Sequence, residues 1–364
     1  MIYELAAEDY HRVRALVAGL TYHLSVQAVI DGTVAGHIWV DDLLNPQAAF
    51  MLTPEGQYLV GASDNSAFRQ ALADLLLTMP VVNLTYSPGA WESTFAALLT
   101  CKFARPYARH YYTFRRFLLP DWRELLPQGY EMAQVDQAFL ARQDLAHLDD
   151  VRDWTANWTD FARDGFGFCL LHDGAIVSHC IADCVSGHAC EVGIVTQRDY
   201  QRRGLGALTV AATVEHCLER QLSTIGWHCL ANNRGSQRVA EKVGFEFVGA
   251  YVQYANSVVA ENANDLTPPE WRAEGEYFER AAEMLRQHET WMAWRAAKAH
   301  AVAGNHAHAM ILLQRLADSK TMLPGWDAWL REGWEFQGMQ AAPEWPTLLA
   351  RAQAAPPAEG EAAN

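Results

Sequence analysis

The stretch "TQRDYQRRGLGALTV", residues 196–210, most constrains what this chain can fold into, because it sets two glycines and two adjacent arginines between an apolar run and a helical pattern. Backbone N–H groups at the start of a helix attract an anion. Glycines let a phosphate approach without a Cβ in the way. Arg202 and Arg203 add positive charge to a chain whose formal net charge is −15. The stretch therefore predicts a loop that binds a pyrophosphate.

Two other kinds of phosphate loop do not match this sequence. A nucleotide P-loop has the pattern GxxxxGK[ST], and here no lysine follows the second glycine. A dinucleotide loop has the pattern GxGxxG, and here Thr209 stands where the third glycine belongs. What remains is Gln201-x-x-Gly204-x-Gly206-Ala207, which follows a predicted strand and opens a predicted helix.

The segment around the loop alternates strand and helix patterns. The run "FGFCLLHDGAIVSHCIADC" predicts a hairpin with Asp173 and Gly174 as its tight turn. The strand "ACEVGIVT" leads into the loop, and apolar residues at helical spacing predict a helix from about Leu205 to Arg220. Further strands are predicted at 130–135, at 223–230 and in "GFEFVGAYVQY", with a short helix at 235–243 before the last of them.

Two stretches of this segment resemble motifs of the GNAT acetyltransferase superfamily. "EVGIVTQRDYQRRGLGAL" is similar to its strand-and-loop motif, (Q/R)xxGx(G/A), and "ANNRGSQRVAEKVGF" to its second motif, which ends in Gly-Phe. The resemblance covers roughly residues 128–255, about a third of the chain. The double-domain layout and the ending "SQRVAEKVGFEFVGAY" resemble the antibiotic-resistance-type branch that includes zwittermicin A resistance proteins.

The resemblance implies the fold and the place of acetyl-CoA. The fold would be the α/β GNAT acyltransferase fold, a mixed sheet with flanking helices that splays open between the parallel strands 190–196 and 223–230. The pantetheine arm would pair with backbone groups of Ile194, Val195 and Thr196. The pyrophosphate would bind the loop residues Gln201, Arg202, Arg203, Gly204, Leu205, Gly206 and Ala207. Asn233 falls on the family's CoA-contacting asparagine and Ser236 on its small position, although both can also serve as a plain helix cap.

Glu191 is the candidate general base. It lies on the strand before the loop, and strand alternation places it on the same face as Gly193 and Val195, which we expect to leave it room and low polarity. Its place ten residues before Gln201 matches a glutamate of the amine-acetylating GNAT branches. The alternative is a carboxylate that orients substrate or belongs to a hydrogen-bond network. A backbone N–H near Val195 or Thr196 would stabilise the carbonyl oxygen.

The usual acid of the family is missing. Many members protonate the leaving thiolate with a tyrosine four residues before the Gly-Phe glycine, and that position is Ala240 here. Tyr251, Tyr254 and Tyr200 are the remaining candidates, and each can equally be a packed aromatic residue. The missing tyrosine keeps a non-catalytic interpretation open.

The patterns outside this segment predict further domains. Residues 1–123 read as an N-terminal α/β domain, with a degenerate GNAT-like unit as one interpretation, and 124–260 as the acyltransferase domain. Residues 266–350 read as a helical domain, similar to one tetratricopeptide unit, with two antiparallel helices turned at Gly304-Asn305. The low-complexity stretch 351–364 predicts a disordered tail.

The composition of the chain limits the kinds of partner that it is expected to bind. The acidic balance argues against nucleic-acid binding, and no apolar run approaches the length of a membrane span. Seven cysteines without a CxxC pattern predict reduced, mostly buried thiols. A zinc site at Cys180, Cys184 and Cys190 with His179 and His188 is disfavoured, because ligands four residues apart on a strand lie about 13 Å apart. With no signal or transit peptide recognised, we expect a cytoplasmic protein that needs no metal.

The leading hypothesis is an acetyl-CoA-dependent N-acyltransferase that acts on an amine of a small molecule by direct attack in a ternary complex. A non-catalytic acyl-CoA-binding sensor and a protein N-acetyltransferase are the alternatives. The C-terminal helices would pass a signal to a partner in the first alternative and read the protein substrate in the second. A protein partner or a second copy of the chain is expected to bind through these helices.

Overall fold

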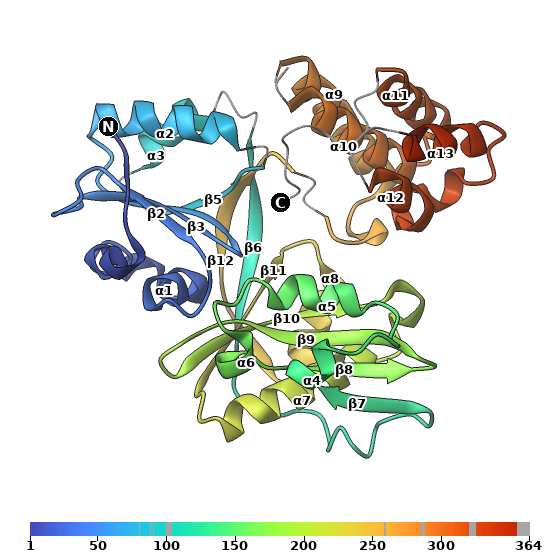
Figure 1. Ribbon diagram of the computed structural model, residues 1–364, viewed down its shortest axis with the longest axis horizontal. Helices are drawn as coiled ribbons and strands as arrows, with labels where there is room; N and C mark the ends of the chain where they lie inside the picture. The colour runs from blue at the N-terminus through green and yellow to red at the C-terminus, as the bar shows by residue number, and fades with distance from the viewer. Residues whose placement is uncertain are drawn as a thin grey trace. The chain divides into compact units, whose positions relative to one another are not determined.

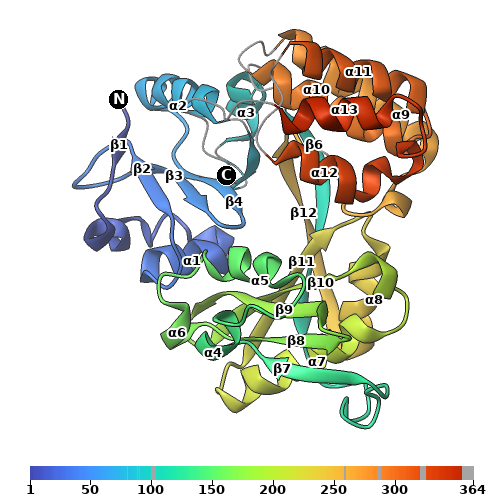
Figure 2. The same cartoon turned by 45° about the vertical axis from the view of Figure 1, so that its right-hand side comes forward.

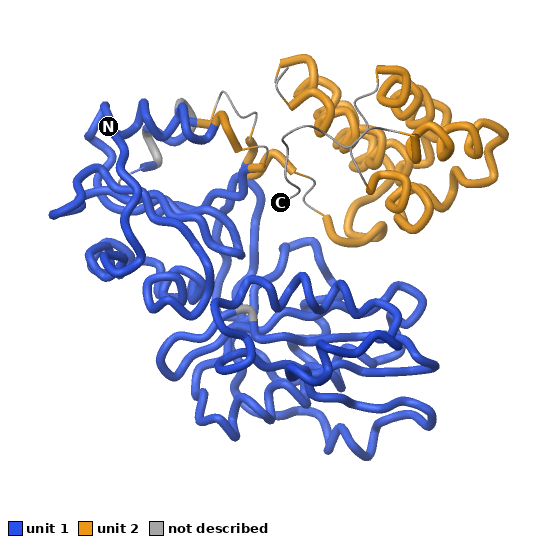
Figure 3. Tube along the Cα trace, in the orientation of Figure 1, with its two compact units in different colours: residues 1–76, 82–98, 106–254 blue, residues 77–81, 99–105, 255–364 orange. Residues whose placement is uncertain are grey.

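The computed structural model describes residues 1–79, 81–87, 89, 91–99, 104–257, 260–284, 288–319 and 325–354. Backbone packing divides the chain into two compact units (Figure 3). Unit 1 comprises residues 1–76, 82–98 and 106–254, and unit 2 comprises residues 77–81, 99–105 and 255–364. Each unit is described by itself below.

Unit 1 is built on a single mixed sheet flanked by helices. Its first half contributes β1 (Tyr3–Glu4), α1 (Leu24–Asp31), β2 (His37–Val40), β3 (Ala48–Thr53), β4 (Gly56–Gly61), α2 (Ser66–Thr78), β5 (Asn83–Tyr86), α3 (Glu92–Leu99) and β6 (Arg105–Phe114). Its second half contributes β7 (Tyr130–Gln134), α4 (Gln137–Leu140), α5 (Leu148–Thr155), α6 (Phe161–Asp164), β8 (Gly167–His172), β9 (Ala175–Ser186), β10 (Ala189–Thr196), α7 (Leu205–Glu219), β11 (Thr224–Leu230), α8 (Arg234–Val243) and β12 (Phe245–Ala255).

The strands of both halves form one twelve-stranded sheet (Figures 1 and 2). Its order is β1-β2-β3-β4-β5-β12-β6-β11-β10-β9-β8-β7. β6 falls within the predicted N-terminal domain, yet it pairs with β11 and has β12 on its other side. The sheet thus continues across the predicted boundary at residues 123 and 124, and the domain limits stay a prediction.

Several predicted elements are confirmed. β10 covers the strand "ACEVGIVT", and β8 and β9 form the predicted antiparallel hairpin. Asp173 and Gly174 at its tip both have positive φ values, 50° and 77°. These values are typical of a type I′ turn, which suits the twist of a two-residue hairpin.

Helices cover both faces of β8. Consecutive residues of a strand point to opposite sides, so neighbouring residues of β8 contact different helices. Leu170 joins a core cluster with Leu205 of α7. Its neighbour Leu171 joins a cluster with Phe139 of α4 and Val151 of α5. α5 and α7 therefore pack on opposite faces of the sheet. The glycine loop of the candidate site leads into α7, and residues of α5 line its cavity.

Unit 2 contains the helices α9 (Pro268–Met284), α10 (Glu289–Val302), α11 (His306–Asp318), α12 (Trp326–Glu332) and α13 (Trp345–Gln353). The turn at Gly304-Asn305 lies between α10 and α11, as predicted, and the core is rich in aromatic rings. Trp294 and Trp326 stack with ring centroids 4.2 Å apart. The likeness to a tetratricopeptide unit stays a prediction.

α13 extends to Gln353, so the first residues of the predicted tail are helical, while residues 355–364 lie outside the described residues. Among the described helices of the chain, none is both long and apolar enough to cross a membrane.

Candidate functional site

The parallel strands β10 and β11 separate soon after they meet. They pair only from Ala189↔Thr224 to Glu191↔Gly226. Beyond this point the described part of β10 pairs with β9, and that of β11 pairs with β6. The two strands therefore leave a wedge that starts at Glu191, which agrees with the predicted opening of the sheet.

The peptide groups along the open side of β10 follow from its pairing with β9. The N–H of Gln197 donates to the carbonyl of Val177 over 2.9 Å. Because paired residues of an antiparallel ladder alternate in direction, the peptide groups of Val195 also point to β9, and those of Ile194 and Thr196 point into the wedge. Of the three residues predicted to pair with pantetheine, Ile194 and Thr196 direct their backbone groups into the wedge, and Val195 does not.

The glycine loop leaves a row of backbone donors at the start of α7. Arg202 and Gly204 take left-handed φ values of 60° and 83°, which turn the chain sharply into the helix. Within the described residues, we find no backbone acceptor for the N–H groups of residues 202–206. Ala207 N–H, also predicted to face the pyrophosphate, donates to the Gly204 carbonyl over 3.1 Å. The side chain of Gln201 donates to the Thr196 carbonyl and thereby ties the loop to β10.

Gly206 has a packing role besides its predicted place near phosphate. A Cβ added to it would lie 2.8 Å from Thr196 Oγ1, so glycine lets α7 approach β10 closely. Near the same loop, Lys242 Nζ lies 3.4 Å from the position that a Cβ of Gly204 would occupy. Lys242, which the sequence analysis did not select, therefore places a third positive charge beside Arg202 and Arg203.

Asn233 and Ser236 form the cap of α8. The Asn233 side chain accepts a hydrogen bond of 2.9 Å from Ser236 N–H. The hydroxyl of Ser236 accepts another, of 3.1 Å, from the indole of Trp227. The capping alternative is thus confirmed, while a contact with CoA stays a prediction.

Glu191 lies buried at the point where the two strands separate, with 6% of its surface exposed. Its Oε1 accepts a hydrogen bond of 2.8 Å from Leu24 N–H, the first backbone N–H of α1, and lies 3.4 Å from His228 Nε2. Cys184 Sγ is 3.8 Å from the other oxygen. The surroundings of Glu191 are therefore more polar than its strand neighbours suggested, because a helix terminus from the first half of unit 1 reaches it.

His228 connects Glu191 with Tyr251. Its Nε2 lies 2.9 Å from the Tyr22 carbonyl, and its Nδ1 lies 2.9 Å from Tyr251 Oη. A carbonyl oxygen only accepts hydrogen bonds, so the neutral ring carries its proton on Nε2 and accepts at Nδ1 from the hydroxyl of Tyr251. The three side chains lie in a row from β10 through β11 to β12, in which His228 and Tyr251 share a hydrogen bond and His228 Nε2 lies 3.4 Å from Glu191.

Two stacked rings hold His228 in place. His23 stacks on it with centroids 5.3 Å apart, and Tyr111 stacks on it at 4.9 Å. Burial, together with the nearby His228 and Arg109, lowers the pKa of His23 well below its usual value. Burial raises the pKa of Tyr251, so this hydroxyl keeps its proton at neutral pH.

The other tyrosine candidates lie in packed surroundings. Tyr254 packs edge-on against Phe95 at 4.7 Å, and Tyr200 Oη lies 3.4 Å from His172 Nδ1. Ala240 is fully buried in the main core of unit 1. Of the three tyrosines, the described structure brings Tyr251 together with Glu191.

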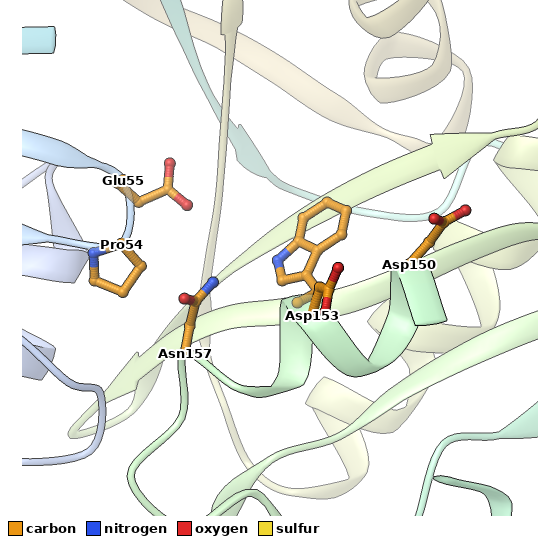
Figure 4. A pocket seen from close by; sticks show the side chains of 6 residues that line it. Pro54, Glu55, Asp150, Asp153 and Asn157 are labelled. Carbon is orange, nitrogen blue, oxygen red and sulfur yellow. The ribbon is translucent and has the colours of Figure 1, made fainter. Parts of the chain in front are cut away.

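A cavity of about 400 Å³, wide open to solvent, lies between the β3–β4 turn and α5. The β3–β4 turn lines one side and α5 with the residues after it the other (Figure 4). The lining residues are Pro54, Glu55, Asp150, Asp153, Trp154 and Asn157. Gln197 Nε2 donates to Asp150 over 3.2 Å, which ties the cavity to the residue that follows β10.

His179 lies behind this cavity. It is 1% exposed, and both its ring nitrogens lack a hydrogen-bond partner among the described residues. Its ring meets Trp154 edge-on at 5.2 Å, and it pairs with Val195 in the sheet. Burial lowers the pKa of His179 to about 4, so the ring is neutral at physiological pH.

The cysteines are buried free thiols in the described part of the chain, as predicted, while Cys101 lies outside it. Cys190 and Cys217 bring their sulfur atoms within 3.5 Å of each other in the core. Among the described residues, the metal-ligating side chains that cluster closely are Glu279, His300 and His308 of unit 2, and not the cysteines and histidines of β9 and β10.

Comparisons with known proteins agree with this geometry. A family model described as GNAT acetyltransferase matches residues 14–254. The uncharacterized N-acetyltransferase YdfB of Bacillus subtilis (strain 168) is 24% identical over 263 residues, which are 70% of this chain and 98% of that protein. The crystal structure of a GCN5-related N-acetyltransferase-like protein from Streptococcus suis is similar with a TM-score of 0.54 and 25% identity, over 68% of this chain and 98% of that one.

Proposed function

Because the chain belongs to the GNAT acetyltransferase family, we propose that this N-acetyltransferase moves the acetyl group of acetyl-CoA to an amine of a small molecule. The observation that carries the proposal is the wedge between β10 and β11, together with the loop N–H groups for which the described residues offer no backbone acceptor. A thioester arm paired along Ile194 and Thr196 and a pyrophosphate on the loop fit these two features.

The cavity between the β3–β4 turn and α5 supports an amine as the acceptor. Three carboxylates line it, those of Glu55, Asp150 and Asp153, and they attract a protonated amine. The indole of Trp154 adds an aromatic surface that suits a cation. Coenzyme A carries negative charge and would be repelled here, so the cavity suits the acceptor and the glycine loop suits the cofactor.

The row Glu191–His228–Tyr251 supplies the proton transfers of the proposed mechanism. The acceptor loses a proton to Glu191 through water, and the free amine attacks the thioester carbonyl. A wedge-facing N–H, of Ile194 or Thr196, stabilises the oxyanion of the tetrahedral intermediate. The carbon–sulfur bond then breaks, and the departing thiolate takes the proton of Tyr251. The second proton of the attacking nitrogen passes through water to the Tyr251 phenolate, and Glu191 returns its proton to solvent. His228 positions Tyr251 by accepting the hydrogen bond of its hydroxyl.

Release of CoA tests this proposal directly. The purified chain is incubated with acetyl-CoA and a panel of diamines, monoamines, amino acids and peptides, and the free thiol is measured with a thiol reagent. We expect release that depends on a cationic small amine, together with an acetylated amine in the mass spectrum. Binding of acetyl-CoA without release for any acceptor would favour a sensor instead, and release with peptides alone would favour a protein N-acetyltransferase.

A further inference from the structure

We propose that Glu279, His300 and His308 in unit 2 bind a divalent transition metal ion, with zinc as the preferred ion. The three side chains come from three different helices, α9, α10 and α11. His300 Nε2 lies 2.7 Å and His308 Nε2 2.9 Å from the same oxygen, Glu279 Oε1. One potential ligand atom of each residue falls within 4.8 Å of the others. The site does not involve the residues of acyl transfer.

The kinds of donor select the ion. Two imidazole nitrogens and one carboxylate oxygen suit zinc, which takes both at about 2.0–2.2 Å. Calcium and magnesium bind mainly through several oxygens, and this group offers one carboxylate. Ligand atoms around a tetrahedral zinc lie about 3.4 Å apart, so the two nitrogen–oxygen pairs, at 2.7 and 2.9 Å, have to open by roughly 0.5 to 0.7 Å. Small side-chain rotations suffice, and the fourth position is left to water.

A glycine in α9 leaves room for the imidazole ring of His300. Gly275 stands in α9 one turn before Glu279, and a Cβ added to it would lie 2.5 Å from His300 Nε2 and 2.6 Å from its Cδ2. Glycine is disfavoured inside a helix compared with alanine. At this position it leaves the space that lets the imidazole reach the Glu279 carboxylate, and any larger residue would close it.

The group has a buried side and an open side. The His300 side chain is 3% exposed, whereas those of Glu279 and His308 are 31% and 38% exposed. The two rings cross nearly at right angles, with centroids 4.6 Å apart. An ion can therefore enter past His308 and Glu279, while His300 anchors it from the core.

An unpaired ring nitrogen of His300 limits the affinity that we expect for zinc. His300 Nδ1 is buried and lacks a hydrogen-bond partner in the described part of the chain. A metal on Nε2 moves the ring proton to Nδ1, where it stays unpaired. This weakens binding by roughly 10- to 100-fold relative to a site with a paired outer nitrogen. We therefore expect weaker zinc binding than at a site whose outer histidine nitrogens are all paired.

Calorimetric titration of the untagged, chelator-treated full chain with Zn²⁺ tests the site. We expect one equivalent of zinc to bind the wild type and to raise its melting temperature. His308→Gln and Glu279→Gln should lose that equivalent and the shift in melting temperature. His306→Gln, an exposed histidine at the start of the same helix as His308, is the matched control and should keep both.

Cobalt gives a second readout. Co²⁺ bound at this site should show the visible absorption of a tetrahedral ion without a thiolate band, which distinguishes it from binding to cysteine. Circular dichroism checks that each variant is folded. If the wild type binds no more zinc than His308→Gln, or if the cobalt spectrum shows sulfur ligation, the proposal is wrong and the three residues serve as a hydrogen-bonded contact between helices.

Discussion

The backbone N–H of Leu24 donates a hydrogen bond of 2.8 Å to the carboxylate of Glu191. This contact joins the first turn of α1 to the strand that flanks the proposed thioester site. Because α1 comes from the first half of unit 1 and β10 from the second, the two halves build the catalytic candidate together. The contact also fixes the rotamer of Glu191 toward His228.

Replacing Glu191 with glutamine tests its role as a base. Glutamine keeps an oxygen that can accept from Leu24, and it loses the ability to take a proton. We expect kcat to fall about 10²-fold or more, with the affinity for acetyl-CoA nearly unchanged. Glu131→Gln, exposed on β7, is the control. Normal turnover by Glu191→Gln would leave deprotonation to another group.

Tyr251 and Tyr254 form a matched pair on β12. Tyr251→Phe removes the hydroxyl that contacts His228, so we expect a loss in kcat of roughly tenfold to a hundredfold. Tyr254→Phe removes a hydroxyl from a ring that packs on Phe95, so we expect little change. Steady-state kinetics with one acceptor compares the two. Equal effects would exclude Tyr251 as the specific acid.

Lys242 should contribute to cofactor binding through its charge beside the loop. Lys242→Gln is expected to weaken acetyl-CoA binding by roughly threefold to tenfold, and less at high salt, because an exposed charge acts through a screened field. Arg315→Gln on α11 removes the same charge from an exposed position in unit 2 and serves as the control. Calorimetry at two salt concentrations measures both. Equal affinities for the two variants would remove Lys242 from the site.

Asp153 should bind the acceptor rather than take part in the chemistry. Asp153→Asn removes one of the charges lining the cavity, and we expect KM for a cationic amine to rise about threefold to tenfold at constant kcat. Asp149→Asn changes the same charge on the same helix, at a residue that does not line the cavity and is paired with Arg152. A KM unchanged by Asp153→Asn would place the acceptor elsewhere.

His179 should make the fold sensitive to acid. Because its pKa is lowered to about 4, the folded state prefers the neutral ring, and the stability it contributes is present above pH 6.5. That contribution is lost as the pH falls from about 6.5 toward 4, up to about 3 kcal/mol. Urea denaturation of the wild type and His179→Leu at pH 7.5 and 4.5 tests this. The variant should lose less stability on acidification, and parallel losses would contradict the assignment.

Local patterns predicted the second half of unit 1 well. Strand β10, the hairpin at Asp173-Gly174 and the loop before α7 depend on short-range rules of alternation and turn chemistry. His228 could also have been found. Since Glu191 pairs with Gly226, a residue two positions further along β11 lies on the same face, and that residue is His228.

Contacts between segments that lie far apart in the sequence could not be predicted from local patterns. Nothing local in the sequence brings Leu24 to Glu191, Lys242 to Gly204 or Glu55 to α5. Gly206 illustrates the same limit, since its value for phosphate binding was predicted and its close approach to Thr196 was not. A bulky residue there, such as valine, would therefore strain the fold as well as the loop.

The place of β12 in the sheet has a consequence for synthesis on the ribosome. β12 is the last of the described strands to emerge, yet it lies between β5 and β6. Until residues 245–255 emerge, each of these earlier strands keeps an unpaired edge, and such edges invite pairing with other chains. The sheet of the first half therefore remains incomplete until β12 is synthesised. A premature stop before residue 245 would release a product prone to aggregate rather than a smaller working domain.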